Sequence, residues 1–318
     1  MILVAGESLV DLVIDSSGGI TPRGGGGPYN AARAVSRLGQ TCMFLGRFSD
    51  DRFGRMLKST LVADGVQLAC PEPLSAPTTL ALAEISDHGD ASYHFYLVET
   101  AASLVSERDV RAALSVLEKA PAGTRAVHVG TLGLILEPTG TSMESLVSAV
   151  PAGTIVMLDP NCRPAATVDP AGYRRRVERL AARADIVKVS HDDLAFLYPG
   201  SSQDDAVRSL LALGASAILL TRGSRAAIAI TRGGSVEVLV PQVQVADTIG
   251  AGDSFGGAFV AWWIQRGLKR EDASDLRLLA AGLRFSTAVA AVTCQRVGAE
   301  PPRLDELDPS ARSSWAGA

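Results

Sequence analysis

The sequence predicts an α/β protein in which a mostly parallel, doubly wound β-sheet is covered by helices and a small second sheet lies beside it. Three observations support this fold class. From about residue 107 onward, short apolar runs alternate with segments of helical period, as in parallel strands joined by crossover helices. The chain has 318 residues, 47% of them hydrophobic, which suffices for one large core. Two earlier segments break the alternation and predict strands alone.

The opening residues, MILVAGESLVDLVID, are apolar, but Glu7 and Asp11 interrupt them and no basic segment precedes them. They therefore predict neither a signal peptide nor a membrane span. Residues 9–20 predict a hairpin-like pair of strands, and residues 78–98 predict two strands around a DHGD turn. Because the strands are apolar on two faces, we expect this small sheet to cover the ligand site with one face. We expect the other face to pack against a second copy in a homodimer.

The segments 1–8, 21–77 and 99–308 are predicted to form the main α/β domain, and the small polar tail 309–318 is expected to be flexible.

A formal net charge of −4 without blocks of like charge excludes nucleic acid and membrane surfaces as expected partners. The chain has four cysteines and no C-x-x-C pair. This pattern favours reduced thiols and a cytoplasmic location.

The segment from Gly24 to Gly39, GGGGPYNAARAVSRLG, predicts a glycine-rich turn followed by a helix. Glycines let the backbone approach a ligand closely, and the Asn30 side chain offers a donor and an acceptor to a hydroxyl group. The segment is therefore suited to binding a polyol. A flexible loop in which Asn30 caps the helix is an equally good interpretation of this segment alone.

The alternating part of the chain supplies the remaining strands of the main sheet. Their sequences are AVHVGTLGLIL, TIVMLDPN, DIVKVS, AILLTRG, AAIAIT and VEVLVP. Polar residues follow directly after several of these runs: Asp159, Asn161, Ser190, Asp193, Thr221, Gly223 and the segment from Asp247 to Asp253. Because ligands of such sheets gather at the carboxyl ends of the strands, we expect these residues to share one rim.

The segment from Asp247 to Phe259, DTIGAGDSFGGAF, places a carboxylate where a glycine turn becomes a helix. At a helix N-terminus, the N–H groups of Gly250, Ala251 and Gly252 can face an anion. A carboxylate is repelled by a bound phosphate, so a plain anion-binding loop gains nothing from Asp253. A phosphoryl-transfer site, in contrast, needs a base for the attacking hydroxyl. The segment thus indicates a kinase site.

Other interpretations of this turn are weaker. In an isolated turn, Asp253 would most simply cap the helix. A dinucleotide-binding fingerprint is disfavoured because Gly250, Gly252 and Gly256 give G-x-G-x-x-x-G, one residue too long, with Phe255 where close packing needs glycine. No G-x-x-x-x-G-K-[ST] run occurs in the sequence, which excludes a Walker-type phosphate loop.

Three motifs together resemble the ribokinase-like (PfkB-type) carbohydrate kinase family: GESLVD near the start, GG-x-P-x-N-x-A-x(6)-G ending at Gly39, and D-T-x-G-A-G-D-x(3)-G-A-F-V from Asp247. The resemblance implies a ribokinase-like parallel-sheet domain with a β-sheet lid, and ATP and Mg²⁺ as co-substrates. By position, it makes Asp253 the base and Gly250, Ala251 and Gly252 the anion hole. It assigns sugar binding to Asp11, Gly26 and Asn30, and nucleotide binding to Ser190, Thr221 and Gly223.

The sequence departs from the family pattern at two places. Ser49 stands where the first motif expects glycine, so the loop there is expected to differ. The N-x-x-E element is replaced by Ser190-His-Asp-Asp193, and the shorter Asp193 side chain is expected to contact Mg²⁺ through water. Some relatives also bind a monovalent cation. For K⁺, Asp247 and the Ile249 carbonyl near Gly298 are the candidate ligands here.

The segment DPNCRP with VKVSHDDLAFLYPG resembles the fructokinase and 2-keto-3-deoxygluconate kinase branch. Asn161 and Arg163 are candidate substrate ligands, although Arg163 could equally fix the loop through a salt bridge. Where keto-acid kinases carry an arginine on the lid, this chain has Leu97, after Phe95 and Tyr96. A neutral ketohexose such as fructose is therefore expected. 2-Keto-3-deoxygluconate, ribose or a nucleoside, and a sensing protein without catalysis, are the alternatives.

Overall fold

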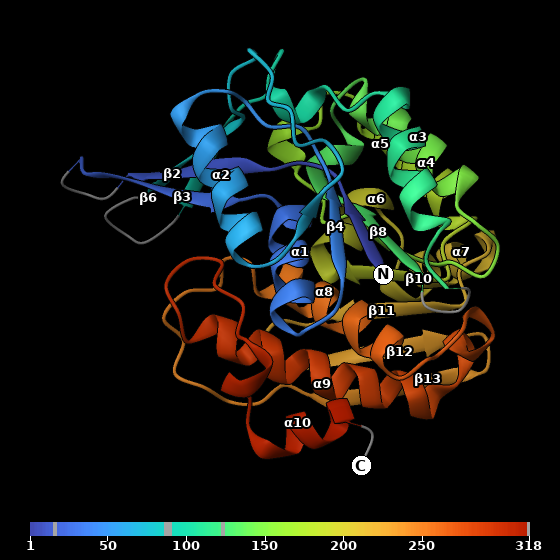
Figure 1. Cartoon of the computed structure of the whole chain (residues 1–318). Coiled ribbons are helices and arrows are strands. Elements are labelled where there is room, and N and C mark those ends of the chain that lie inside the picture. The colour runs from blue at the N-terminus through green and yellow to red at the C-terminus, as the bar shows by residue number, and fades with distance from the viewer. Residues whose placement is uncertain (15–17, 86–90, 122–124, 317–318) are drawn as a thin grey trace.

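The computed structural model describes residues 1–14, 18–85, 91–121 and 125–316 and has the predicted α/β fold (Figure 1). Within these residues, a nine-stranded sheet has the order β13-β12-β11-β10-β9-β8-β1-β4-β5. Its strands are β1 (Ile2–Ala5), β4 (Cys42–Leu45), β5 (Gln67–Leu68), β8 (Ala126–Gly130), β9 (Ile155–Asp159), β10 (Ile186–Ser190), β11 (Ala217–Thr221), β12 (Ala226–Thr231) and β13 (Gly234–Leu239). Only the pairings β11–β12 and β12–β13 are antiparallel among these described strands, so the predicted mostly parallel sheet is confirmed.

Helices cover both faces of this sheet. One face carries α1 (Gly27–Arg37), α2 (Arg52–Ala63), α8 (Ala251–Gln265), α9 (Leu276–Cys294) and α10 (Pro309–Ala316). The other carries α3 (Glu107–Leu117), α4 (Thr139–Ala149), α5 (Pro170–Ala181), α6 (His191–Leu197) and α7 (Gln203–Leu213). Short 3-10 turns are η1 (Ala101–Ser103), η2 (Thr131–Leu134), η3 (Pro164–Ala166), η4 (Arg270–Ser274) and η5 (Leu304–Glu306).

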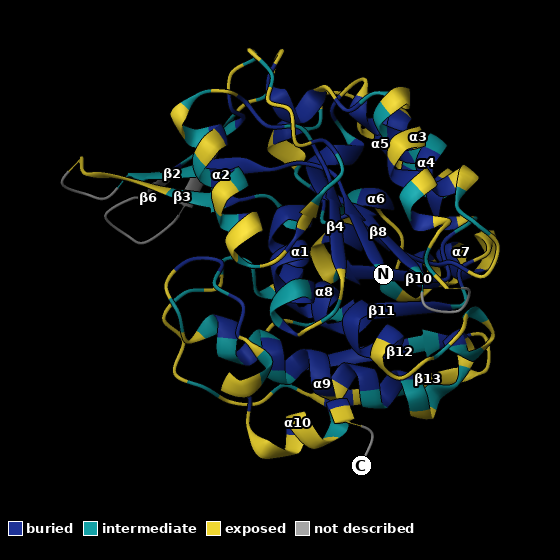
Figure 2. Ribbon diagram, in the orientation of Figure 1, coloured by how far each residue is buried: buried dark blue, intermediate teal, exposed yellow. Residues whose placement is uncertain are grey.

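The central strands are buried on both faces (Figure 2). In β1, for example, Ile2 and Val4 pack into the core under α1 and α8, whereas Leu3 and Ala5 pack into the core on the opposite face. This alternation follows from the period of two along a strand. The two cores explain why these strands are apolar throughout rather than at every second position.

A second sheet of four described strands projects from the main domain on the left of Figure 1. We call it the lid sheet. Its strands are β2 (Leu9–Ile14), β3 (Ile20–Gly25), β6 (Leu80–Ile85) and β7 (Ala91–Tyr96), in the order β3-β2-β6-β7. The predicted boundary at residue 20 was too early, because pairing of β3 with β2 continues to Gly25 and overrides the weak strand preference of TPRGG. The predicted DHGD turn lies outside the described residues.

The predicted flexible tail was wrong for residues 309–316, which form helix α10. The Trp315 side chain is only 7% exposed, and its ring centroid lies 5.2 Å from that of Phe285 on α9. The Trp262 indole N–H also donates to the Ser314 carbonyl at 3.2 Å. Burial of one large aromatic side chain therefore outweighs the polar composition of this segment.

Helix α9 is long and apolar enough to cross a membrane by length and composition, with a mean hydropathy of 1.3. However, 56% of that window is buried inside the protein, where α9 packs against α8 and against strands β12 and β13. It is therefore a core helix of the α/β domain.

Candidate active site

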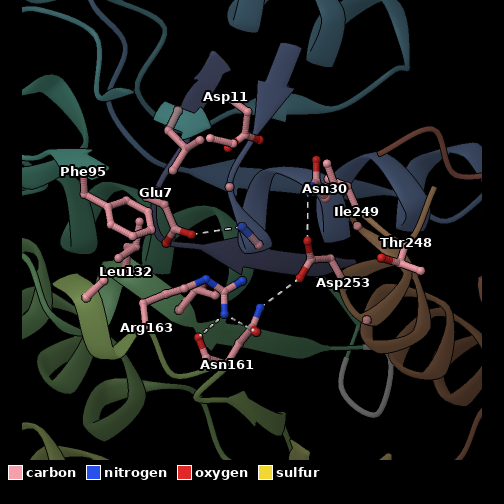
Figure 3. Close-up of a pocket in the computed structure, with 18 of the residues that line it drawn as sticks. Glu7, Asp11, Asn30, Phe95, Leu132, Asn161, Arg163, Thr248, Ile249 and Asp253 are labelled. Carbon is pink, nitrogen blue, oxygen red and sulfur yellow. Dashed lines mark hydrogen bonds between the residues drawn. The ribbon is translucent and has the colours of Figure 1, made fainter. Parts of the chain in front are cut away.

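The carboxyl ends of the parallel strands meet at one edge of the main sheet, as predicted. Gly130 of β8 lies opposite Asp159 of β9, and Ser190 of β10 lies opposite Thr221 of β11. Beside this edge is a cavity of about 500 Å³. The loops after β1, β8 and β9 and the start of α8 line it, and the lid sheet covers it with Leu9, Asp11, Val13, Ala83 and Phe95 (Figure 3).

Asp253 lies in the cavity wall at the N-terminus of α8. Helix α8 begins at Ala251, after Gly250 with φ +74°. Within the described chain, the N–H groups of Gly250 and Gly252 have no hydrogen-bond partner, and the Ala251 N–H donates to the Thr248 carbonyl over 3.3 Å. The start of the helix therefore presents free donors beside a carboxylate that is 9% exposed.

Two asparagines hold the Asp253 carboxylate (Figure 3). Nδ2 of Asn30 donates to Oδ2 at 2.9 Å, and Nδ2 of Asn161 donates to Oδ1 at 3.2 Å. Each carboxylate oxygen keeps a lone pair for a further donor. Oδ1 of Asn30 is buried and has no hydrogen-bond partner within the described chain. Asn30 therefore lies inside α1 as part of the site and does not cap the helix.

Arg163 fixes the loop after β9. Its Nη1 donates to the side-chain Oδ1 of Asn161 at 2.6 Å, to the Asn161 carbonyl at 2.9 Å and to the Cys162 carbonyl at 3.2 Å. Asn161 has φ +39°, a strained conformation that these bonds stabilise. The loop-fixing role considered for Arg163 is thus present, although its partners are carbonyl groups and an amide rather than an acid. The side chain also lines the cavity.

Glu7 is a site residue that sequence reasoning missed. Its side chain is 1% exposed and accepts hydrogen bonds from the N–H groups of Gly27 at 2.9 Å and Gly133 at 2.7 Å. It thereby connects the first turn of α1 to the 3-10 turn η2, which follows β8. Burial raises the pKa of Glu7 to about 7, against the effect of these hydrogen bonds. An acid inside the apolar run MILVAGESLV was the available signal.

Asp11 reaches the cavity from β2 of the lid sheet. Burial, reinforced by the negative charge of Asp253, raises the pKa of Asp11 to about 6. Gly25 on the paired strand leaves room for this side chain, because a Cβ atom there would lie 2.2 Å from Oδ2 of Asp11. Asp11 and Asp253 therefore face the same cavity, which suits a ligand that carries several hydroxyl groups.

The predicted nucleotide-binding residues lie outside this cavity, along the same edge of the sheet. The Ser190 hydroxyl caps helix α6, Thr221 ends β11, and Gly223 has φ +58° with open space around it. Oδ2 of Asp193 is committed to the cap. Its Oδ2 accepts from the N–H and the hydroxyl of Ser190, both at 2.7 Å, and its Oδ1 accepts from the Cys162 N–H at 2.6 Å.

The candidate residues for a monovalent cation come together around the turn before α8. Asp247 accepts from the Ile249 N–H at 3.0 Å through Oδ1 and from the Gly298 N–H at 2.8 Å through Oδ2. The carboxylate thus fixes the turn before α8 to the loop after α9.

Ser49, the departure from the first motif, is buried and its hydroxyl accepts from the Asp51 N–H at 3.0 Å. Its φ is not positive, so no glycine is needed there.

A carboxylate beside free N–H donors at a helix N-terminus, in a cavity under a β-sheet lid, is the arrangement that a small-molecule kinase needs. Comparison with known proteins identifies the family. The chain belongs to the pfkB family of carbohydrate kinases, whose sequence profile matches residues 1–306.

Individual relatives agree with this assignment. The chain is 32% identical to a fructokinase of Rhizobium leguminosarum bv. trifolii, over 82% of this chain and 79% of the relative. It is also 32% identical to the probable fructokinase-5 of Arabidopsis thaliana, over 95% of this chain and 93% of the relative. Among solved structures, ATP-bound fructokinase from Xylella fastidiosa is similar with a TM-score of 0.81 and 25% identity, covering 94% and 93% of the two chains. Aminoimidazole riboside kinase from Salmonella enterica has a TM-score of 0.79 and 27% identity, covering 94% of each chain.

Proposed function

We propose that this carbohydrate kinase transfers the γ-phosphoryl group of ATP to a hydroxyl group of fructose or a closely related ketohexose. The observation that carries the proposal is the Asp253 carboxylate, held by Asn30 and Asn161 beside the free N–H groups of Gly250 and Gly252. The names of the similar fructokinases support ATP and fructose as the substrates.

The chemistry of the cavity supports a neutral sugar. Glu7, Asp11 and Asp253 are acidic groups in its lining, and they would repel a sugar acid. Arg163 is the one cationic side chain in the described lining, and its Nη1 is already engaged by three acceptors of its own loop. Leu97, where a sugar-acid kinase would carry an arginine, packs against the apolar cluster of Leu9 and Leu132.

The residues divide the transfer step between them. The attacking sugar hydroxyl donates its proton to Asp253 as its oxygen forms a bond to the γ-phosphorus, and the bond between that phosphorus and the β–γ bridging oxygen breaks to release ADP. The free N–H groups of Gly250 and Gly252 stabilise the charge on the transferring group. Gly27 leaves room for the hydroxyl, since a Cβ there would lie 2.6 Å from Thr131 Oγ1 and 3.2 Å from Asp253 Oδ1.

Asp159 and Asp193 fit a role in holding the Mg²⁺ that the family implies. Oδ1 of Asp159 is buried and has no hydrogen-bond partner within the described chain, and Oδ1 of Asp193 accepts one hydrogen bond. No group of three or more metal-ligating side chains occurs among the described residues, so these oxygens would act through water, as Mg²⁺ commonly allows. When bound, Mg²⁺ supplies positive charge to the β- and γ-phosphates. Asp247 and the Ile249 carbonyl remain our candidates for K⁺.

We further propose that the outer face of the lid sheet forms a homodimer. Phe95 lines the cavity, whereas the next residue, Tyr96, is 58% exposed, and Ile20 on β3 is 59% exposed. Large apolar side chains on a thin sheet are typical of an interface. Sedimentation at micromolar concentration tests this proposal, and a monomer would contradict it.

A coupled ATP-consumption assay with a panel of acceptors tests the proposed function. The panel contains fructose, tagatose, ribose, 2-keto-3-deoxygluconate and nucleosides, including aminoimidazole riboside because of the Salmonella enterica neighbour. We expect the highest kcat/KM with fructose or tagatose. A higher kcat/KM with the sugar acid or with a nucleoside would reject the ketohexose assignment. If no acceptor in the panel is phosphorylated, kinase activity on these acceptors is rejected.

A further inference from the structure

Lys188 is a buried cation that the mechanism above does not use. It lies in β10 within the apolar run DIVKVS and is 4% exposed. Its Nζ is 2.7 Å from Oδ2 of Asp159, the last residue of β9. A lysine ammonium has three donors, and this ion pair uses one of them. The other two have no partner within the described chain, a costly arrangement for a buried charge unless a ligand completes it.

The ion pair lies against the side of α8 that carries no side chains. A Cβ atom on Gly252 would be 3.6 Å from Nζ of Lys188. One turn later, a Cβ on Gly256 would be 3.6 Å from Oδ2 of Asp159 and 3.7 Å from Cδ of Lys188. The ammonium is therefore in van der Waals range of the first turn of α8, beside the free N–H of Gly252. Nothing at Gly252 stands between Nζ and a phosphoryl group bound at this helix N-terminus.

The surrounding charges require a cation at this position. Nζ of Lys188 lies 2.7 Å from Oδ2 of buried Asp159, and the carboxylates of Asp193 and Asp253 add further negative charge around it. Burial, and to a lesser extent this ammonium, lowers the pKa of His128 to about 3, which keeps that imidazole neutral. Without Lys188, the γ-phosphoryl group would approach three carboxylates with no fixed positive charge beside them.

We propose that Lys188 is a catalytic residue of the phosphoryl transfer. Its ammonium donates hydrogen bonds to the γ-phosphoryl oxygens, because Gly252 has no side chain to block the approach. It would act together with the N–H groups of Gly250 and Gly252, as a fixed positive charge next to the bond that breaks. Asp159 holds the ammonium in place. This inference rests on the proposed kinase function, so wild-type turnover of ATP with a sugar is established first. Its absence would count against the proposed function rather than against Lys188.

The main test compares Lys188→Met with a control at the opposite end of β10. Arg270→Met removes the cation that pairs with buried Asp185 at 2.8 Å, just before β10 begins. We expect Lys188→Met to lower kcat about 100-fold, the scale of one lost charge-stabilising donor, with the sugar KM within about threefold of wild type. Arg270→Met should keep the wild-type kcat. A wild-type kcat in Lys188→Met would overturn the proposal.

Nucleotide binding separates a catalytic role from a structural one. By calorimetry, Lys188→Met should bind a non-hydrolysable ATP analogue about tenfold or more weakly, with little change for ADP, because only the analogue has a γ-phosphoryl group. Equal losses for both nucleotides would overturn the proposal. If Lys188→Met does not fold, Gly252→Ala replaces it. Its Cβ has room, with no atom closer than 3.6 Å, and would screen Nζ. Gly252→Ala should likewise bind the ATP analogue more weakly while its affinity for ADP changes little. Unchanged affinity for the analogue would count against the role proposed for Lys188.

Discussion

Nδ2 of Asn30 donates to Oδ2 of Asp253 over 2.9 Å, although 223 residues separate the two in the sequence. This contact connects α1, the helix after the glycine turn, to α8, the helix that carries Asp253. Asn161 reaches the other oxygen of the same carboxylate from the loop after β9. The Asp253 carboxylate is therefore oriented from two sides, and our proposal requires such preorganisation of the base.

Asn30→Ala should lower kcat/KM for the sugar about 100-fold. The change removes the donor that orients Asp253 and also the buried Oδ1 that has no partner in the described chain, and each such hydrogen bond contributes about 1 to 3 kcal/mol. Steady-state kinetics on the best acceptor measure the effect. Gln40→Ala, which removes an exposed amide bonded to Gln265, is the control. Equal kcat/KM in the two variants would show that Asn30 does not contribute to the reaction.

The sugar KM should rise as pH falls through about 6, because Asp11, whose pKa is raised to about 6 by burial and by Asp253, then becomes neutral. A neutral acid is a weaker acceptor for a sugar hydroxyl than a carboxylate. Asp11→Asn should have a high KM at every pH and no such step. Profiles of kcat/KM between about pH 5 and 8 decide this. If kcat/KM of Asp11→Asn still changes near pH 6, the assignment of this step to Asp11 is contradicted. A change that remains near pH 7 in Asp11→Asn belongs to Glu7, whose pKa is about 7.

Gly250→Ala should lower kcat about 100-fold and also lower Tm. Gly250 has φ +74°, and a Cβ there would lie 2.4 Å from Cβ of Ala299, so the anion hole must move. Gly39→Ala is the matched control, because Gly39 has φ +91° with no atom within 4 Å. It should lose about 1 kcal/mol of stability from backbone strain alone and keep the wild-type kcat. Similar kcat values for the two variants would mean that the Gly250 turn does not hold the transferring group.

Trp315→Ala should destabilise the protein by about 3 to 5 kcal/mol without changing kcat at 25 °C, since the indole packs on Phe285 and does not line the cavity. Denaturant unfolding measures the loss. Val168→Ala, at a side chain that is 98% exposed, should change stability very little. If Trp315→Ala unfolds at the wild-type midpoint, the C-terminal segment does not anchor the fold.

The sequence predicted those parts of the structure whose signals are local. Alternating apolar runs predicted the parallel sheet, and the turn before α8 predicted a carboxylate at a helix N-terminus with free N–H groups beside it. The family motifs placed Asn30 and Asp253 in one site.

Other features depend on contacts between distant segments, and no local pattern encodes them. Pairing with β2 extends β3 to Gly25, and the fit of Trp315 against α9 orders α10. Glu7 and Lys188 were each visible as a charge inside an apolar run. Their partners, Gly133 and Asp159, became apparent only when the fold brought them together.

The central claim is that the Asp253 carboxylate takes the proton from the sugar hydroxyl, and the turnover of Asp253→Asn tests it most directly. The variant keeps an isosteric side chain, so ATP and sugar affinities should stay near those of wild type. Its kcat should fall by about two to four powers of ten, the scale of a lost general base. A kcat within a few fold of wild type, with both substrates bound normally, would contradict the account.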